Sequence, residues 1–169
     1  MEAMAMLMTS NVHQREYPVS TQQLGALLDT VGRPDDRLWP GHWPAVEFDR
    51  PLAVGARGGH GPIRYTVTDY QPGQRVECRF DQKLGFDGTH TFEVKPGTEP
   101  GHTMLRHALV AHPTTMTGRL RWLAVRLIHD ALLEDLLDRA GREVGAPPKH
   151  AARWSVWVRL LRQCLRISY

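Results

Sequence analysis

Cysteine is scarce in this chain of 169 residues, which has only Cys78 and Cys164 and no pair spaced as Cys-x-x-Cys. Two cysteines with this separation make neither a disulfide framework nor a zinc site. A chain of this length buries about two-thirds of its unfolded surface, so its fold needs neither kind of cross-link. The sequence therefore favours a reducing compartment, and we expect the cytoplasm.

The sequence also lacks the short motifs of the common enzyme classes. It has no Gly-x-Ser-x-Gly, P-loop, Gly-x-Gly-x-x-Gly or His-Glu-x-x-His, so hydrolase, kinase, dinucleotide-binding and zincin activities have no support. The opening residues, MEAMAMLMTS, have Glu2 where a signal peptide is basic, and their apolar run is broken by Thr and Ser. We expect neither a signal peptide nor a membrane span there, and we expect residues 1–10 to be flexible.

Acidic residues are missing from residues 147–169, although this tail has five Lys and Arg. Residues 1–146 hold 16 Lys and Arg against 18 Asp and Glu, a net charge of −2. The net charge of +3 of the whole chain therefore comes from the tail. Proteins that bind phosphate backbones normally carry a basic stripe, so we expect no nucleic-acid partner.

The first third of the chain predicts few regular elements. Residues 11–17 favour a short strand, and Ser20 with Gln23 forms a capping box that starts a helix ending at Gly32. Residues 33–62 are rich in proline and glycine, and they predict a flexible, partly aromatic flap with a short strand around 46–48. In this flap, three aromatic residues either gate a cavity or pack the loop onto the body: Trp39, His42 and Trp43.

After Pro62 apolar and polar residues alternate with a period of two, and turn residues separate the runs. This pattern is typical of an antiparallel meander with one apolar face and one charged face. The four predicted strands are 63–68, 75–81, 90–95 and 104–109.

After Pro113 the period changes to 3.6, which predicts one long helix to about Glu143. One apolar stripe is expected to cover the sheet: Trp122, Val125, Ile128, Leu132, Leu133, Leu136, Leu137 and Ala140. A second stripe exists only on the opposite face of the first half: Leu120, Leu123, Ala124, Leu127 and Ala131. In the second half, the four-residue spacing of Asp130, Glu134 and Asp138 predicts a solvated acidic face.

The tail predicts a second, basic amphipathic helix. Two prolines in 146–148 end the long helix, and residues 151–167 place Trp154, Trp157 and other apolar residues opposite arginines. The helix can fold back on the outer face of the long helix as an antiparallel hairpin, within one chain or across a homodimer, or it can bind an anionic membrane. We favour the hairpin, because it covers the second apolar stripe and brings two basic residues near the acidic face: Lys149 and Arg153.

The stretches GHGPIRYTVTDYQPGQRVECRF, GFDGTHTFEV, TMLRHAL and HDALLEDLLDRA resemble actinobacterial polyketide cyclase-like members of the SRPBCC superfamily, which includes START domains and birch-pollen-allergen-like proteins. The resemblance implies an α+β helix-grip fold, in which a curved antiparallel sheet of six or seven strands wraps round a long C-terminal helix. Residues 11–145 would form this ligand-binding domain, and residues 146–169 would add the amphipathic helix. No cofactor is implied, and the fold alone does not define an activity.

The resemblance implies a cavity between sheet and helix that takes a small hydrophobic or aromatic molecule, lipid- or polyketide-like. The alternative is a cyclase, aromatase or dehydratase, in which His90, His107 and Tyr65 are the candidates for proton transfer. A further alternative is a regulatory or membrane-associated module that acts through the basic tail. The predicted ligand contacts are the inward positions Tyr65, Val67, Val76, Cys78, Phe80, His90, Phe92, Leu105, His107, Val125, His129 and Leu132.

Three of these positions are histidines that point toward one another in the predicted fold. If Lys95 pairs with His102 across the turn, His90 lies opposite His107, and His129 faces them from the helix. Such a set can anchor a polar ligand or move protons, or each histidine can simply be satisfied within the core. The sequence shows no metal-ligand spacing among them, so we expect no metal site.

Overall fold

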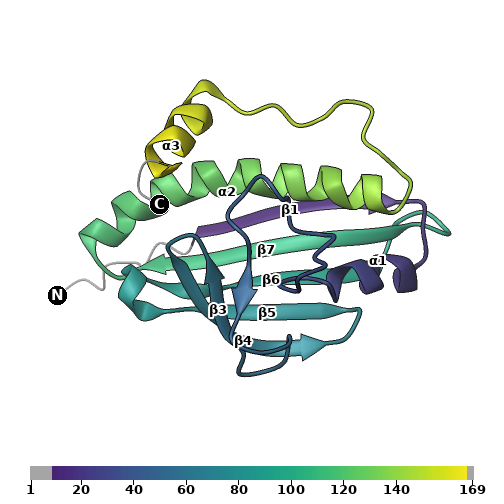
Figure 1. The fold of residues 1–169 in the computed structure, drawn as a ribbon, viewed down its shortest axis with the longest axis horizontal. Helices are drawn as coiled ribbons and strands as arrows, with labels where there is room; N and C mark the ends of the chain where they lie inside the picture. Colours follow the sequence, from purple (N-terminus) through teal and green to yellow (C-terminus); the bar gives the residue numbers. More distant parts are fainter. Residues whose placement is uncertain (1–8, 167–169) are drawn as a thin grey trace.

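The computed structural model describes the backbone of residues 9–166 and, except at 120, 121, 123 and 124, the side chains of residues 10–163. Seven antiparallel strands form one sheet in the order β1-β7-β6-β5-β4-β3-β2, and a long helix lies across it (Figure 1). This is the predicted arrangement of a sheet around a long C-terminal helix, followed by an extra helix. The elements are β1 (Thr9–Tyr17), α1 (Thr21–Leu28), β2 (Glu47–Phe48), β3 (Arg57–His60), β4 (Ile63–Gln71), β5 (Arg75–Phe80), the 3-10 turn η1 (Gln82–Leu84), β6 (Phe86–Pro96), β7 (Thr103–Pro113), α2 (Met116–Glu143) and α3 (Val156–Arg166).

Helix α1 begins as predicted and ends earlier than predicted. Ser20 caps it, and both hydrogen bonds of the capping box with Gln23 are present. The helix ends at Leu28 rather than Gly32, because the chain goes on in tight turns, in which the Thr30 amide donates to the Leu27 carbonyl and the Val31 amide to the Leu28 carbonyl. At this end the carboxylate of Asp29 accepts hydrogen bonds from the Gly73 amide at 2.8 Å and the Tyr70 hydroxyl at 3.1 Å. These bonds fix the end of α1 to the β4–β5 turn.

Strand β3 was not predicted, because its glycines are more typical of loops. It pairs with β2 on one side and β4 on the other. A Cβ atom on Gly58 would lie 2.0 Å from the Glu47 carbonyl oxygen, so only glycine permits this approach of the two backbones. The glycines therefore allow the pairing that extends the sheet to β2.

The predicted pairing of β6 with β7 is wrong by two residues. His90 lies opposite Leu109, and His107 lies opposite Phe92. The physical reason is a tighter turn, in which the Gly97 amide donates to the His102 carbonyl and Gly101 adopts a positive φ of 78°. A shift of two residues keeps every side chain on its face, so both histidines still point inward. The prediction of a shared inward face is confirmed.

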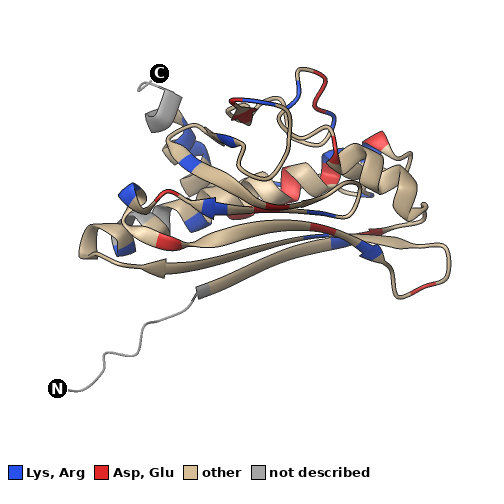
Figure 2. Ribbon diagram, turned by 90° about the horizontal axis from the view of Figure 1, so that it is seen from below, with Lys and Arg blue, Asp and Glu red and all other residues tan. Residues whose placement is uncertain are grey.

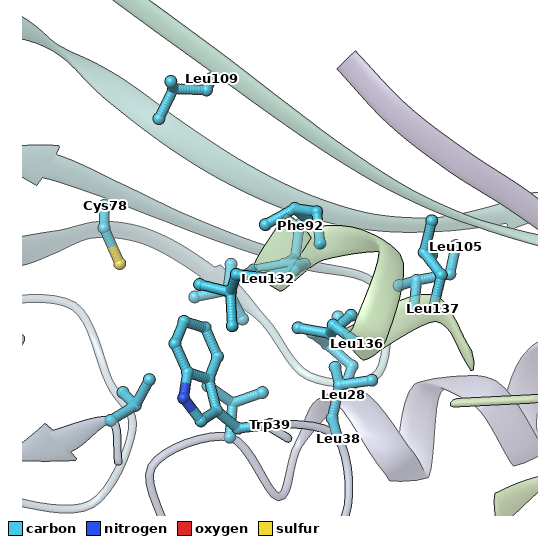
Figure 3. Close-up of a cluster of buried hydrophobic side chains, with 14 of the residues drawn as sticks. Leu28, Leu38, Trp39, Cys78, Phe92, Leu105, Leu109, Leu132, Leu136 and Leu137 are labelled. Carbon is cyan, nitrogen blue, oxygen red and sulfur yellow. The ribbon is translucent and has the colours of Figure 1, made fainter. Parts of the chain in front are cut away.

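The predicted apolar stripe of α2 faces the sheet. Figure 3 shows how part of its second half packs, with Leu136 near Leu28 and Leu38, and Leu137 near Leu105. All of these side chains are buried. The second half of α2 is therefore part of a filled core, joined to α1 and to the loop that follows it.

The predicted solvated acidic face of α2 is wrong for Asp138, while the side chains of Asp130 and Glu134 remain 41% and 42% exposed. All acidic residues of α2 lie in its second half (Figure 2), and three of them contact β1. Asp138 is buried and pairs with Arg15 at 2.5 Å, and Glu134 pairs with His13 at 2.8 Å. The reason is that the inward positions of β1 are polar, so the acids find partners there.

The tail folds back over α2, and α3 lies against the outer side of that helix (Figure 1). The Ala152 amide donates to Asp138 and the Trp154 indole donates to Asp135, at 2.7 and 2.8 Å. This agrees with a hairpin within one chain. The helix is shorter than the predicted 151–167, because the extended residues before it make these contacts and the Ser155 hydroxyl accepts from the Val158 amide.

Two details of the predicted hairpin differ. Asp138 and Glu134 take Arg15 and His13 as partners, rather than Lys149 and Arg153, which are exposed. Leu127 stays 43% exposed, so the tail does not cover the second apolar stripe there. The predicted burial of Leu120 and Leu123 and the flexibility of residues 1–8 fall outside the described parts of the chain. Among the residues that are described, no helix is long and apolar enough to cross a membrane.

Candidate ligand cavity

A cavity of about 820 Å³ lies between the first half of α2 and the edge of the sheet at β3 and β4. Its wall is mostly apolar and aromatic, with a few histidines and one arginine. The cavity therefore has the apolar wall, between sheet and long helix, that the sequence resemblance implied. It is lined by Trp39, Gly41, His42, Trp43, Pro44, His60, Gly61, Pro62, Ile63, Leu84, Phe86, Val125, Ile128, His129, Leu132 and Arg162.

One wall is the loop of residues 39–44, which is held to α2. The guanidinium of Arg139 donates to the backbone carbonyls of Asp36, Arg37 and Trp39 at 2.9, 2.9 and 2.5 Å. The Trp39 indole donates to the Pro44 carbonyl at 2.9 Å. Trp39 and Trp43 are both buried. The tryptophans thus pack the loop onto the body, which was one of the two interpretations of the sequence. They line the cavity as well.

The tail supplies another part of the wall through Arg162. Its guanidinium lies over the faces of two indole rings, 4.2 Å from the centre of Trp43 and 4.1 Å from that of Trp154. It also donates to the His42 carbonyl. Asp135 accepts from both indoles at 2.8 Å. This cluster connects α3, the loop of residues 39–44 and α2 at the cavity.

The predicted ligand contacts fall into two groups. Val125, His129 and Leu132 line the cavity. The remaining nine are buried between sheet and helix and are not part of the cavity wall, so their contact with a ligand stays a prediction. They are Tyr65, Val67, Val76, Cys78, Phe80, His90, Phe92, Leu105 and His107.

Sequence reasoning missed the wall residues of the β3–β4 turn and of the segment around η1. His60, Ile63 and Phe86 come from these segments. His60 stands in GGHGP, where the glycines predict a loop. The sequence therefore did not indicate a strand that turns the imidazole inward. Only the tertiary fold brings these residues opposite α2.

A row of aromatic rings connects the cavity wall to the interior. The Nδ1 atom of His60 and the hydroxyl of Tyr65 are joined by a hydrogen bond of 3.2 Å. The ring of Tyr65 lies 4.5 Å from that of His90, which lies 5.7 Å from His107. The row ends at His129, 4.9 Å from His107, so both ends of the row belong to the wall.

The histidines of this row are neutral at neutral pH. Burial lowers the pKa of His60 to about 4 and that of His90 to about 3. Burial, together with the neighbouring imidazoles, also lowers the pKa values of His107 and His129 well below 6.5. A neutral imidazole offers one hydrogen-bond donor and one acceptor, so His60 and His129 can anchor a hydroxyl or carbonyl group in the cavity.

Tyr65, the remaining candidate for proton transfer, and Cys78, a predicted ligand contact, are held in their neutral forms. Burial raises the pKa of Tyr65 well above 10 and that of the Cys78 thiol to about 12. A protonated thiol is a poor nucleophile, so the raised pKa argues against covalent catalysis by Cys78. Tyr65 can still donate a hydrogen bond.

Neither a model of a known protein family nor a curated protein matches the chain. Among similar solved structures are CalU16 from Micromonospora echinospora (14% identity; 95% of this chain and 85% of that chain covered; TM-score 0.56) and norcoclaurine synthase from Thalictrum flavum (12%; 85% and 90%; 0.62). Another is a protein from Thermobifida fusca (14%; 86% and 99%; 0.63). These similarities confirm the birch-pollen-allergen-like helix-grip fold that the sequence resemblance predicted, and at such identities they show the fold alone.

Proposed function

We propose that this protein binds a small apolar or aromatic molecule in the cavity beside the first half of α2. The observation that carries the proposal is the cavity of about 820 Å³ with its apolar wall. Sites for small molecules commonly have about 300–1,000 Å³ and a few polar groups in an apolar lining. Each Å² of apolar ligand surface buried there contributes about 25 cal/mol to binding.

The polar groups of the wall favour an aromatic ligand that bears a hydroxyl or carbonyl group. Trp39 and Trp43 offer flat faces for a ring, while His60 and His129 offer neutral donors and acceptors. The structure of norcoclaurine synthase, which shares the fold, contains dopamine and hydroxybenzaldehyde. These are ring compounds with hydroxyl groups, which supports this choice over a purely aliphatic lipid.

Filling the cavity tests the proposal. Ile128→Trp places a large side chain on the wall, whereas Leu127→Trp adds the same side chain one position earlier, where the residue is exposed and does not line the cavity. Native mass spectrometry of protein purified from its source cells detects a retained ligand. We expect the ligand in the wild type and in Leu127→Trp and its loss in Ile128→Trp. Equal retention by both variants would place the ligand elsewhere.

A second candidate function is proton-transfer catalysis of the cyclase or dehydratase type. The hydrogen bond between His60 and Tyr65 favours it, because it places a buried proton donor next to the wall. Tyr65→Phe would then leave the recovered ligand bound but stop its conversion, as mass spectra of the ligand over time would reveal. Unchanged conversion in this variant excludes Tyr65 as the acid.

The exposed surface of α3 supports a further candidate function, which is contact with an anionic membrane. Val156, Trp157 and Leu160 are exposed, and Arg159 stands among them. Tryptophan next to arginine suits the membrane interface. Sedimentation with phosphatidylserine vesicles should carry down the wild type and less of a Trp157→Gln variant, while recovery of all protein in the supernatant would remove this candidate.

A further inference from the structure

Three metal-ligating side chains meet where α2 crosses β1. One ligand atom from each of His13, His129 and Asp130 lies within 4.8 Å of the other two. His13 comes from the inward face of β1, and the other two are neighbours on α2. Sequence reasoning assigned His13 no role and found no metal-ligand spacing, because His13 lies more than a hundred positions before the other two residues.

Buried His129 gives independent support for a ligand at this place. Its side chain is only 9% exposed, and its Nδ1 atom has no hydrogen-bond partner within the described residues. A buried polar atom without a partner costs about 1–3 kcal/mol. Where Nδ1 is the atom that coordinates the metal ion, its lone pair no longer carries this cost.

The surroundings of His13 also fit a metal ligand. Its Nδ1 atom lies 2.8 Å from a carboxylate oxygen of Glu134, whose other oxygen accepts from Arg15 at 3.0 Å. If Nδ1 donates to Glu134, the Nε2 lone pair of a neutral ring faces the Asp130 carboxylate at 3.1 Å. Two electron-rich atoms at this distance repel unless a proton or a metal ion lies between them. A metal-binding histidine commonly donates its second nitrogen to a carboxylate in this way.

We propose that His13, His129 and Asp130 form a binding site for one divalent transition-metal ion, with zinc as the first choice. Two imidazole nitrogens and a carboxylate oxygen are ligands that zinc accepts, and three protein ligands leave a fourth position for water or a substrate. Asn11 donates to Asp130 at 2.7 Å and orients the carboxylate. His129 also lines the cavity, so the site adjoins the proposed ligand cavity through this residue.

The test is a zinc titration of the tag-free full chain after treatment with EDTA, in competition with a chromogenic chelator. We expect one Zn²⁺ per chain, and at least tenfold weaker binding in His13→Gln and in Asp130→Asn. Asp130 is 41% exposed, so its variant should fold. Glu134→Gln, which changes the partner of His13, should weaken binding about tenfold. His102→Gln is the matched control, because it removes a histidine near Glu99 in the β6–β7 turn and should bind zinc like the wild type.

Three results would overturn the proposal. One is the absence of stoichiometric zinc binding, and another is equal binding by the wild type, His13→Gln and Asp130→Asn. The third comes from nitrogen NMR: if both ring nitrogens of His13 stay protonated after zinc is added, a proton rather than a metal ion bridges the two carboxylates. If Asp130→Asn loses zinc but still retains an organic ligand, the metal site and the ligand cavity are separate sites, because Asp130 is not part of the cavity wall.

Discussion

The two halves of α2 carry the same apolar stripe but pack differently. In the second half, Leu133, Leu136 and Leu137 are fully buried against the sheet, α1 and the loop that holds Leu38. In the first half, Val125 and Ile128 are only partly buried and face the cavity. The stripe therefore predicts which side of a helix faces the sheet, but the elements packed opposite the stripe decide whether that side is filled.

The largest expected effect comes from truncation in the filled half. Leu136→Ala removes a side chain with no exposed surface and should lower the free energy of unfolding by about 2–5 kcal/mol. Val125→Ala, at the cavity wall, should cost less than about 1.5 kcal/mol, because its neighbours leave space there already. Guanidinium unfolding of both variants measures the difference. Equal losses would mean that the two halves are packed alike.

A lower pH should destabilise the fold through the buried histidines of the row that begins at the cavity wall. The unfolded pKa of a histidine is 6.5, whereas His60 and His90 have folded pKa values of about 4 and 3. Between these values the unfolded chain binds more protons, so stability is complete above pH 6.5 and falls as the pH decreases. From pH 7 to pH 5 each of the two histidines should cost about 2 kcal/mol.

The variant His90→Phe checks this pH dependence. Phenylalanine keeps an aromatic ring in contact with Phe80, Tyr65 and Phe92, whose rings already surround His90. The loss of stability between pH 7 and pH 5 should be about 2 kcal/mol smaller in the variant than in the wild type, by guanidinium unfolding at both pH values. The same loss in both proteins would mean that His90 is already protonated, or exposed to water, in the folded state.

In the filled half, a buried ion pair should give the next largest effect. Asp138→Asn weakens the bond to Arg15 and the contact with the Ala152 amide, and should cost about 2 kcal/mol of unfolding free energy, since Arg15 is partly exposed. Asp35→Asn is the control, because Asp35 and its partner Arg33 are exposed, and should cost less than about 0.5 kcal/mol. A loss as small as that of the control would show that water screens the Asp138 pair.

The contacts of Asp138 show how far the sequence could predict this molecule. Alternation and helical periods predicted the sheet, the long helix and the side that each presents to the core, because these depend on local patterns. The partners of the acidic row could also have been found, since Asn11, His13 and Arg15 alternate along β1 and match acids spaced by four on a helix. Finding these partners requires a comparison of two patterns that lie in distant segments of the sequence.

The walls of the cavity could not be predicted in this way. Trp39, His60 and Arg162 come from a loop, a glycine-rich strand and the tail, and no periodic pattern relates them to α2. The β6–β7 register failed for a similar reason, because the length of a turn with Pro100 and Gly101 decided it. Tertiary packing and turn geometry, rather than local preference, set these features.

The smallest expected effect concerns the tail, where α3 covers part of the first half of α2. Cation–π contacts such as those of Arg162 with Trp43 and Trp154 contribute roughly 1–2 kcal/mol when shielded from water. Arg162→Gln should therefore speed amide hydrogen exchange in α3 by about tenfold, while the global unfolding free energy changes by less than about 1 kcal/mol, because α3 opens separately from the core. Arg159→Gln alters an exposed arginine of the same helix and should leave the exchange rates unchanged. If Arg162→Gln instead lowers global stability as much as it speeds exchange, α3 unfolds together with the body, and the tail is a structural part of the domain rather than a separately opening wall of the cavity.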